Sequence, residues 1–427
     1  MPSTLKLDLD LVRSPKLAPT QARRWYRYYA GYAPEFVDDV CGQLDATQRV
    51  LDPWMGSGTT LAVAASHGHT ASGLDLNPTM VVIAKGRLLA DDTIASVDAI
   101  CSDLLRYLNI RRDNMETEPL TQWFTPATAS TIRAMASRID ELLIAPVSAA
   151  SDKANAMSSL AAFFYVALFE ATTAQLKTFQ SRNPTWLKRG EQSTGAISVN
   201  TEEIASAFIQ SVRRLKTHVA TSGRITTRVR NRASLLAGDS RSLPFDDDSH
   251  DLVISSPPYL TRLDYVVGHL AELAVLGSTG LEIRALRDSM IGTPTMGRSI
   301  FDRNLGAVTE ALLDRVTNHP SRAASTYYEP NFRRYFEGMQ ESLKEIQRVC
   351  RPDTNVVLVV QDSRFKDVHI DLASALTDMA QHLGWRKAGQ RDFVNVRSMA
   401  QLNKRAHTVA RTTKPIESVL NLVTPSR

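Results

Sequence analysis

The sequence predicts an α/β fold, built on a Rossmann-like, largely parallel sheet that is interrupted by a large helical insertion. Residues 49–77 alternate strand, loop, helix and strand, which is how a doubly wound sheet begins. A second pair of strand-like segments follows at 234–259, and the continuous apolar strand NVVLVVQDS at 355–363 comes after an amphipathic helix. Between the first two units, residues 91–231 are rich in Ala, Leu, Met and Arg, and we expect them to be mainly helical.

These segments divide the chain of 427 residues into five parts. The insertion at 91–231 is a candidate for DNA or target recognition. The last part ends in two strand-like segments, DFVNVRSM and IESVLNLV, which we expect to pair antiparallel at the sheet edge. The other parts are a first core segment at 1–90, core strands at 232–261, an insertion at 262–330 that is also large enough to recognise a target, and the rest of the core at 331–427.

Composition favours an ordinary globular protein, since 43% of the residues are apolar and 22% are charged. No apolar run approaches the ~20 residues that span a bilayer, and the start MPSTLKLDLDLVR lacks a signal-peptide pattern. The apolar stretch at 160–169 is too short to span and indicates a buried helix. Cys41, Cys101 and Cys350 form no metal-binding pattern. We therefore expect a cytoplasmic, nucleoid-associated protein with free thiols, no structural metal and no membrane contact.

The stretch VLDPWMGSGTTLAVAA places two glycines, Gly56 and Gly58, in a turn between a strand and a helix. Glycine lets the backbone approach a ligand closely, and the helix N-terminus at Thr59 and Thr60 favours an anionic group. A triphosphate-binding loop is excluded because no Lys follows the second glycine, and a dinucleotide fingerprint is excluded because Leu61 stands where a third glycine is needed. The turn indicates a different ligand that carries a carboxylate.

Asp75 ends the next strand, where a carboxylate can accept hydrogen bonds from both hydroxyls of a ribose. Taken alone, Asp75 fits equally well as the cap of a helix that begins near Asn77 and Pro78. Together with the glycine turn, it fits a nucleoside ligand bearing a carboxylate. S-adenosylmethionine is such a ligand.

The segment DLVISSPPYLTRLDYV at 251–266 ends a buried strand with an unusually stiff rim. Residues just past the carboxyl end of a strand line the crevice of a doubly wound sheet. There the proline carbonyls and the Ser256 hydroxyl can hold an exocyclic amine, while Tyr259 offers a stacking face for a flipped base. An isolated PPY would more simply be a strand terminator with a core tyrosine.

The combination resembles the amino-methylating DNA methyltransferases, which make N4-methylcytosine or N6-methyladenine. The matching segments are DPWMGSGTT at 52–60, GLDLNP at 73–78, AGDSRSLPFDDDSHDLVISSPPY at 237–259 and YAGYAPEFV at 29–37. The resemblance, which is nearest to the N4-cytosine type with SPPY, implies a methyltransferase sheet of seven strands, the last one antiparallel, and S-adenosylmethionine as cofactor. It implies a catalytic rim of Ser256, Pro257, Pro258 and Tyr259. It also implies cofactor-side positions at Tyr32, Pro34, Asp52, Pro53, Trp54, Gly56, Ser57, Gly58, Thr59, Thr60, Asp75, Asn77, Asp239 and Ser240.

Amino methylation needs no protein nucleophile, because the exocyclic nitrogen attacks the methyl group directly. None of the three cysteines follows a proline, as the nucleophile of cytosine C5 enzymes typically does. Serine at the first position of the rim resembles the N4-cytosine subgroup, whereas Asp or Asn is usual in adenine enzymes. We therefore expect site-specific methylation of cytosine N4, with adenine N6, an amino group of RNA, or a catalytically silent DNA-binding module as alternatives.

Basic residues provide candidate contacts to double-stranded DNA, although a solvated helix face explains most such runs. Residues 204–238 contain no acidic side chain, a second basic cluster lies near 397–414, and SRNPTWLKRG at 181–190 is a decoy for the rim because Thr185 replaces its second proline. Target sequence, oligomeric state and a cognate restriction or defence partner are left open. The candidates are Arg182, Lys188, Arg213, Arg214, Arg228, Arg230, Arg232, Lys404 and Arg405.

Overall fold

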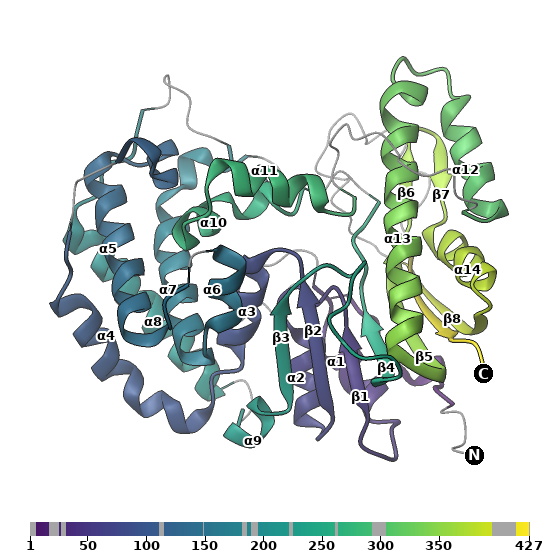
Figure 1. Cartoon of the computed structure of the whole chain (residues 1–427), viewed down its shortest axis with the longest axis horizontal. Helices are drawn as coiled ribbons and strands as arrows, with labels where there is room; N and C mark the ends of the chain where they lie inside the picture. Colours follow the sequence, from purple (N-terminus) through teal and green to yellow (C-terminus); the bar gives the residue numbers. More distant parts are fainter. Residues whose placement is uncertain are drawn as a thin grey trace.

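The computed structural model describes residues 6–16, 25–26, 31–110, 115–147, 149–181, 186–188, 195–221, 225–260, 264–292, 305–394 and 416–426. Its main feature is a seven-stranded sheet in the order β3-β2-β1-β4-β5-β9-β8 (Figure 1). Strands β3, β2, β1, β4 and β5 are parallel, and β9 is antiparallel to both β5 and β8. The strands are β1 (Arg49–Asp52), β2 (Thr70–Asp75), β3 (Ala233–Ala237), β4 (His250–Ser255), β5 (Cys350–Gln361), β8 (Arg386–Val394) and β9 (Ile416–Val423).

This topology confirms the expected α/β, Rossmann-like sheet with an antiparallel last strand. The final two strands pair antiparallel at one end of the sheet, as the sequence indicates, but β9 lies inside and β8 forms the edge. Residues of β9 are almost all buried, whereas every residue of β8 keeps some exposure. The segment DFVNVRSM reaches the described strand only as far as Val394, because 395–415 lie outside the described residues.

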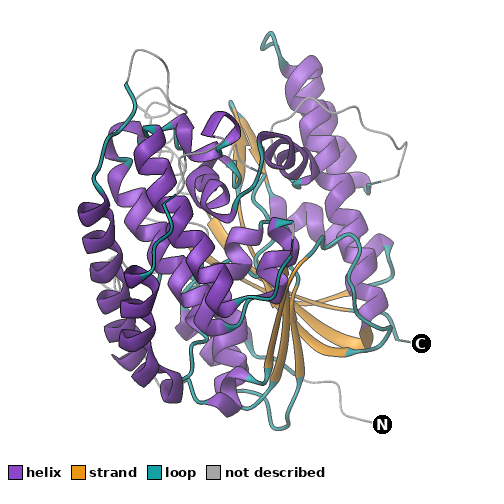
Figure 2. Cartoon of the chain, turned by 60° about the vertical axis from the view of Figure 1, so that its left-hand side comes forward, coloured by secondary structure: helices purple, strands orange, loops and turns teal. Residues whose placement is uncertain are grey.

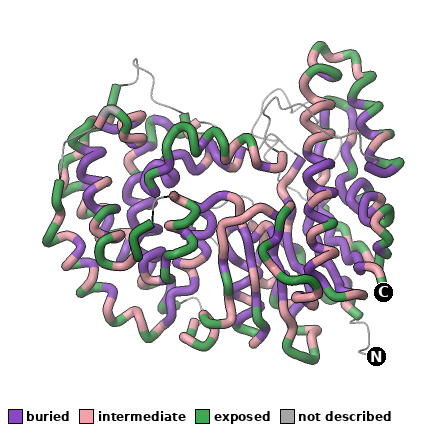
Figure 3. The backbone as a smooth tube through the Cα atoms, in the orientation of Figure 1, coloured by how far each residue is buried: buried purple, intermediate pink, exposed green. Residues whose placement is uncertain are grey.

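The two faces of the sheet belong to two apolar cores, because successive side chains of a strand point to opposite sides. In β1, Val50 packs into the first core and Leu51 into the second. Burial concentrates along the strands and along the helix sides that face them (Figure 3). The first core receives α1 (Pro34–Cys41), α2 (Thr59–Ser66) and α3 (Pro78–Arg87); the second receives α12 (Ala307–Thr317), α13 (Glu329–Val349) and α14 (Leu372–His382).

The helical insertion forms a lobe of helices beside the sheet (Figure 2), and β3 is the strand next to it (Figure 1). Its centre is α7 (Ser159–Gln175), which is apolar on all sides and contacts α3, α5 and α8. The stretch 160–169 is thus a buried helix, and no helix among the described residues is long and apolar enough to cross a membrane. The remaining lobe helices are α4 (Val97–Arg106), α5 (Pro126–Leu143), α6 (Ala150–Ala156), α8 (Thr201–Thr221) and α9 (Thr227–Arg230).

Two helices from the 262–330 segment, α10 (Leu270–Leu276) and α11 (Gly280–Ser289), lie on the same side of the molecule as the lobe, and α10 packs on α7 (Figure 1). Short elements complete the chain. These are the 3-10 turns Leu9–Leu11, Asp91–Ser96, Met115–Thr117, Pro119–Gln122 (η5), Lys177–Phe179 and Val267–His269, the π-turn Ala324–Tyr328, and the hairpin β6 (Ser363–Phe365) and β7 (Val368–Ile370).

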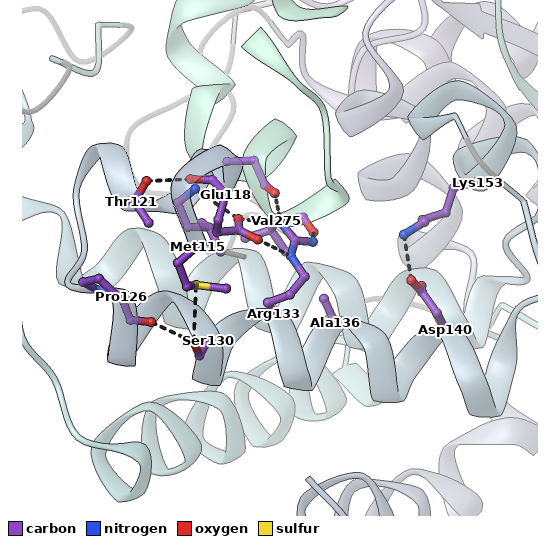
Figure 4. A network of polar contacts seen from close by, with 12 residues as sticks. Met115, Glu118, Thr121, Pro126, Ser130, Arg133, Ala136, Asp140, Lys153 and Val275 are labelled. Carbon is purple, nitrogen blue, oxygen red and sulfur yellow. Dashed lines mark hydrogen bonds and ion pairs between the residues drawn. The ribbon is translucent and has the colours of Figure 1, made fainter. Parts of the chain in front are cut away.

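One arginine of the lobe joins α5 to the end of α10 (Figure 4). Arg133 forms a two-pronged ion pair with Glu118, with both N···O distances at 2.9 Å. The same guanidinium donates to the carbonyls of Ala274 and Val275, at 2.6 and 2.8 Å. These carbonyls belong to the last turn of α10, where the helix dipole favours a cation. Arg133 therefore fixes α10 to the lobe.

A candidate ligand pocket at the carboxyl edge of the sheet

A pocket of about 910 Å³, part of it open to solvent, lies at the carboxyl ends of β1, β2, β3 and β4. Loops that follow these four strands supply most of its wall, and the segment before α1, the first turn of α3, the start of α10 and the end of α11 supply the rest. Because these strands are parallel, their carboxyl ends meet at one edge. The lining residues are Gly31, Tyr32, Pro53, Trp54, Met55, Gly56, Ser57, Thr59, Asp75, Leu76, Asn77, Met80, Gly238, Asp239, Ser240, Ser256, Pro257, Pro258, Tyr259, Tyr265, His269, Ser289, Met290 and Ile291.

The loop after β1 is shaped by its two glycines. Gly56 and Gly58 have φ angles of +48° and +74°, in the left-handed region that side chains disfavour. A Cβ atom on Gly58 would also stand 2.8 Å from the Cβ of Ala84 on α3. Glycine is thus needed for both conformation and space. The loop delivers the N-terminus of α2 to the pocket, where Thr59 lies in the wall.

Asp75 ends β2 and faces the same space. Its Oδ2 accepts the N–H of Gly56 at 3.0 Å, and its Oδ1 accepts the N–H of Asn77 at 2.9 Å. Burial raises the pKa of this carboxyl to about 7, and the two backbone hydrogen bonds act in the opposite direction. The cap of α3 is Asn77, whose side chain accepts the N–H of Thr79. Asp75 is therefore not the helix cap, and its remaining lone pairs are available to a ligand.

Asp52 lies behind the pocket wall rather than in it. Its Oδ1 accepts the Ser255 hydroxyl at 2.5 Å and the N–H of Trp54 at 3.3 Å, and its Oδ2 accepts the Tyr32 hydroxyl at 3.3 Å. Burial raises the pKa of Asp52 to about 6, while these hydrogen bonds lower it. The carboxyl group thus ties the glycine loop, β4 and Tyr32 together. Other proposed cofactor positions that lie outside the pocket wall are Pro34, Gly58 and Thr60.

All four residues of the SPPY rim line the pocket. The Ser256 hydroxyl donates to the carbonyl of Val359 on β5 at 2.9 Å. The Pro258 carbonyl accepts the Tyr335 hydroxyl at 2.8 Å, so it does not simply point outward as the sequence suggested. Part of the hydrogen-bonding capacity of the rim is therefore used within the protein.

The two tyrosines on the wall near the rim are neutral phenols. Burial raises the pKa of Tyr259 above its ordinary value, and nearby Glu417 raises it further. Burial raises the pKa of Tyr265 to about 12. Both rings present uncharged aromatic surface to the pocket at physiological pH. Such surface suits stacking on a planar ligand.

Asp239 and Ser240 reach the wall from the end of β3. Asp239 forms an ion pair with Arg241 at 2.6 Å, and Arg241 also donates to the carbonyl of Ser289 at 2.7 Å. The Ser240 hydroxyl meets that of Ser342 at 2.8 Å. These contacts connect the β3 end of the pocket to α11 and α13. The carboxylate of Asp239 is thus partly neutralised before any ligand arrives.

In its amino-acid sequence, the chain is similar to two type II methyltransferases. It is 21% identical over 405 residues to M.BsoBI of Geobacillus stearothermophilus, covering 85% of this chain and 78% of that protein. It is 21% identical over 415 residues to M.AvaI of Nostoc sp., covering 89% and 83%. The likeness therefore extends over most of the chain rather than over one motif.

A crystal structure of a SAM-dependent methyltransferase from Methanosarcina mazei aligns with a TM-score of 0.30 and 10% identity, over 90% of this chain and 95% of that one. No protein-family model matches the chain.

Sequence reasoning missed ten residues of the pocket wall. Gly31, Met55, Leu76 and Gly238 lie within the quoted motifs, and taking every residue of each motif would have found them. Tyr265 lies six residues after Tyr259, in the same quoted stretch. No local pattern marks the others, because they arrive from helices. These are Met80, His269, Ser289, Met290 and Ile291.

The basic candidates are not gathered at the pocket. Helix α9, which carries Arg228 and Arg230, leads directly into β3 and so lies at the amino edge of the sheet, opposite the pocket (Figure 1). Arg232 donates to the Gly68 carbonyl near the same edge. Arg214 pairs with Glu170 within the lobe. Arg213 and Lys188 are exposed in the lobe, and Arg182, Lys404 and Arg405 lie outside the described residues.

The cysteines are buried and unlike a nucleophile. Burial raises the pKa of Cys41 to about 12 and raises the pKa values of Cys101 and Cys350 as well. A thiol in such surroundings stays protonated at neutral pH. Within the described ranges, no group of three or more His, Cys, Asp or Glu side chains is arranged to hold a metal ion.

Proposed function

We propose that this protein is an S-adenosylmethionine-dependent DNA methyltransferase that methylates N4 of a flipped-out cytosine within a specific sequence. The observation that carries the proposal is that one pocket contains both the glycine turn with Asp75 and the SPPY rim. A methyl donor and an amine acceptor must meet in a single space for direct transfer. The names of the two relatives, both type II methyltransferases, agree with a role in restriction and modification.

The residues present fit the cofactor. The Asp75 carboxylate has lone pairs left for the two ribose hydroxyls, and the N-terminus of α2 suits the methionine carboxylate. Buried apolar side chains from α3 and the glycine loop, such as Met80 and Met55, give the wall a surface for an adenine ring. When bound, the cofactor supplies an electrophilic methyl group on its sulfonium. Tyr32 and Asp52 hold the loop that positions it.

The rim residues orient the target amine. Because the Ser256 hydroxyl hydrogen is directed to Val359, its oxygen acts toward the amine as an acceptor. The Pro257 carbonyl is the second acceptor that we assign to the amine. Two hydrogen bonds from the amino group draw its lone pair out of conjugation with the ring and toward the methyl group. Tyr259 stacks on the base, and no cysteine takes part.

Cytosine N4 and adenine N6 both present such an amine. Serine at the first position of the rim favours cytosine, through the resemblance to the N4-cytosine subgroup. We therefore assign N4-methylcytosine as the product and place the protein in the cytoplasm, associated with the nucleoid. We assign the recognition of the target sequence to the helices around the pocket mouth.

The test is mass spectrometry of nucleosides from DNA and from RNA, each incubated with purified protein and S-adenosylmethionine. N4-methyldeoxycytidine is the expected product. N6-methyldeoxyadenosine would overturn the base assignment, and modification of RNA alone would overturn the DNA assignment. Ser256→Ala should reduce turnover by about a hundredfold, because one of two acceptors for the amine is lost. Methylation that is unchanged in Ser256→Ala would contradict the assigned role of the rim.

A further inference from the structure

We propose that Tyr335 is a positioning residue that holds the SPPY rim so that Ser256 and Pro257 offer hydrogen-bond acceptors to the target base. Tyr335 lies on α13, 77 positions from Pro258 in sequence, and is 1% exposed. It is not part of the pocket wall, so it touches neither ligand. Its influence on the reaction must pass through the rim. The inference rests on the proposed function and deepens it.

The Tyr335 hydroxyl donates to the Pro258 carbonyl at 2.8 Å. Burial raises the pKa of Tyr335 well above its ordinary value, so the phenol keeps its proton and remains a donor. The ring is fixed by edge-to-face packing against Phe336, with 5.2 Å between centroids. A rigid donor from a long helix therefore sets the direction of one rim carbonyl.

A second tyrosine holds the next peptide group. The N–H of Tyr259 donates to the Tyr265 hydroxyl at 3.2 Å. The segment that carries Tyr265 is anchored by Asp264, which is 1% exposed, pairs with Arg287 at 2.5 Å and accepts the N–H groups of Val266 and Val267. Two hydrogen bonds thus hold the rim. Tyr335 of α13 binds the Pro258 carbonyl, and Tyr265, in the loop that follows the rim, binds the Tyr259 amide.

A glycine also packs against the rim. Gly292 has φ of +83°, and a Cβ atom placed there would stand 3.2 Å from the Tyr259 carbonyl and 3.5 Å from the ring of Tyr335. The backbone after α11 therefore lies directly against both residues. There is little room for the rim to rotate its peptide groups, and the hydrogen bonds fix one arrangement.

The consequence is chemical. The Ser256 hydrogen points to Val359 and the Tyr259 amide points to Tyr265, so two of the rim's donors are turned away from the base. The acceptors that remain are the Ser256 oxygen and the Pro257 carbonyl. Such a rim selects an amino group with two hydrogens and rejects a keto oxygen at the same position, whose lone pairs would face unpaired acceptors.

The experiment compares wild-type protein with Tyr335→Phe in steady-state methyl transfer and in amide hydrogen exchange at Tyr259. Loss of the single hydroxyl should lower kcat by at least about tenfold through misplacement of the amine, with the KM for S-adenosylmethionine unchanged. Exchange of the Tyr259 amide should become at least about tenfold faster as the rim loosens. Tyr165→Phe is the control, since Tyr165 is an equally buried phenol bonded to Asp140 in the helical lobe, away from the pocket.

The outcomes separate the two proposals. A wild-type protein that methylates no nucleic acid would sink the proposed function, and the exchange rate at Tyr259 would still decide whether Tyr335 holds the rim. An active wild type with an unchanged kcat and unchanged exchange in Tyr335→Phe would overturn this inference. Equal losses of activity in Tyr335→Phe and Tyr165→Phe, or a KM for the cofactor that rises with the fall in kcat, would also overturn it, because they indicate a general loss of structure.

Discussion

At the scale of single residues, Asp75 combines two needs that oppose each other. In the role proposed for it, Asp75 must be an anion to accept hydrogen bonds from a ribose, yet its surroundings raise its pKa to about 7. The same burial that would exclude water from the ligand makes the Asp75 carboxyl, without a ligand, hold a proton below neutral pH. Ligand hydroxyls that stabilise the anion would reverse part of this penalty. The binding of the ligand and the release of a proton are therefore linked.

We expect S-adenosylmethionine to bind more tightly as pH rises through 7 and to release a proton from Asp75 near pH 6. Calorimetry in two buffers of different ionisation enthalpy measures this release. The sign for stability is the reverse: because the folded pKa lies above the unfolded value of 3.8, the ligand-free fold gains stability from this group at low pH and loses it as pH rises to about 7.

Asp75→Asn is the matched control for this linkage. It keeps the size of the side chain but cannot titrate, so the proton release from Asp75 should disappear, whereas the titration of Asp52, whose pKa is about 6, is left in place. Binding enthalpies that agree between the two buffers in the wild type would rule out the proposed link.

Residues of the pocket were predictable where their chemistry is local. The glycine turn, Asp75 and the rim each occupy a few consecutive positions, and a conformational or chemical demand fixes their residue types. Tyr335 and Met290 could not be predicted in this way, because their positions depend on how α13 and the end of α11 lie relative to the rim that follows β4. The hydrogen bond of Ser256 to Val359 likewise depends on strand pairing that the rim itself does not encode.

At the scale of elements, α10 is a short helix whose place depends on its ends. Its first turn follows His269, which lies in the pocket wall, and its last turn is held by Arg133 of α5. With only seven residues, it has little stability of its own and needs such contacts. The sequence predicted the apolar central helix of the lobe from its composition. It did not predict the contact of Arg133 with α10, because an arginine that caps another helix leaves no periodic pattern in the sequence.

Arg133→Ala should lower the free energy of unfolding by about 2–3 kcal/mol, because it leaves the nearly buried Glu118 carboxylate and two helix carbonyls without their donor. Urea denaturation measures the change. Lys216→Ala is the control: its partner Asp98 is 68% exposed, and removing a surface pair should cost less than about 1 kcal/mol. Similar losses for the two variants would show that Arg133 has no special role.

At the scale of the whole molecule, the pocket and the α9 arginines occupy opposite edges of the sheet. A duplex that delivers a base to the pocket must lie along the carboxyl edge, where α11 ends in the wall at Ser289. Arg284 is exposed on the same helix. We therefore expect position in the fold to matter more for DNA contact than the density of arginines along the sequence.

We expect Arg284→Glu to weaken DNA binding and to reduce its salt dependence, since one phosphate contact is lost. The double variant Arg228→Glu, Arg230→Glu should change affinity by less than about twofold at moderate salt. Fluorescence anisotropy across a salt series measures both. The reverse order of effects would place the duplex at the amino edge and remove the basis for this orientation.

The order of the last strands also constrains how the chain assembles. Strand β8 contacts the sheet through β9 alone, and β9 pairs with β5 along seven residue positions, from Asn355 opposite Val423 to Gln361 opposite Glu417. During synthesis, β8 emerges before the strand that must lie inside it. Until β9 arrives, the edge of β5 is open and β8 has no strand to pair with, which leaves both available to other nascent chains. Completion of the sheet is therefore a late, non-local step, and it is the step at which a chaperone would be of most use.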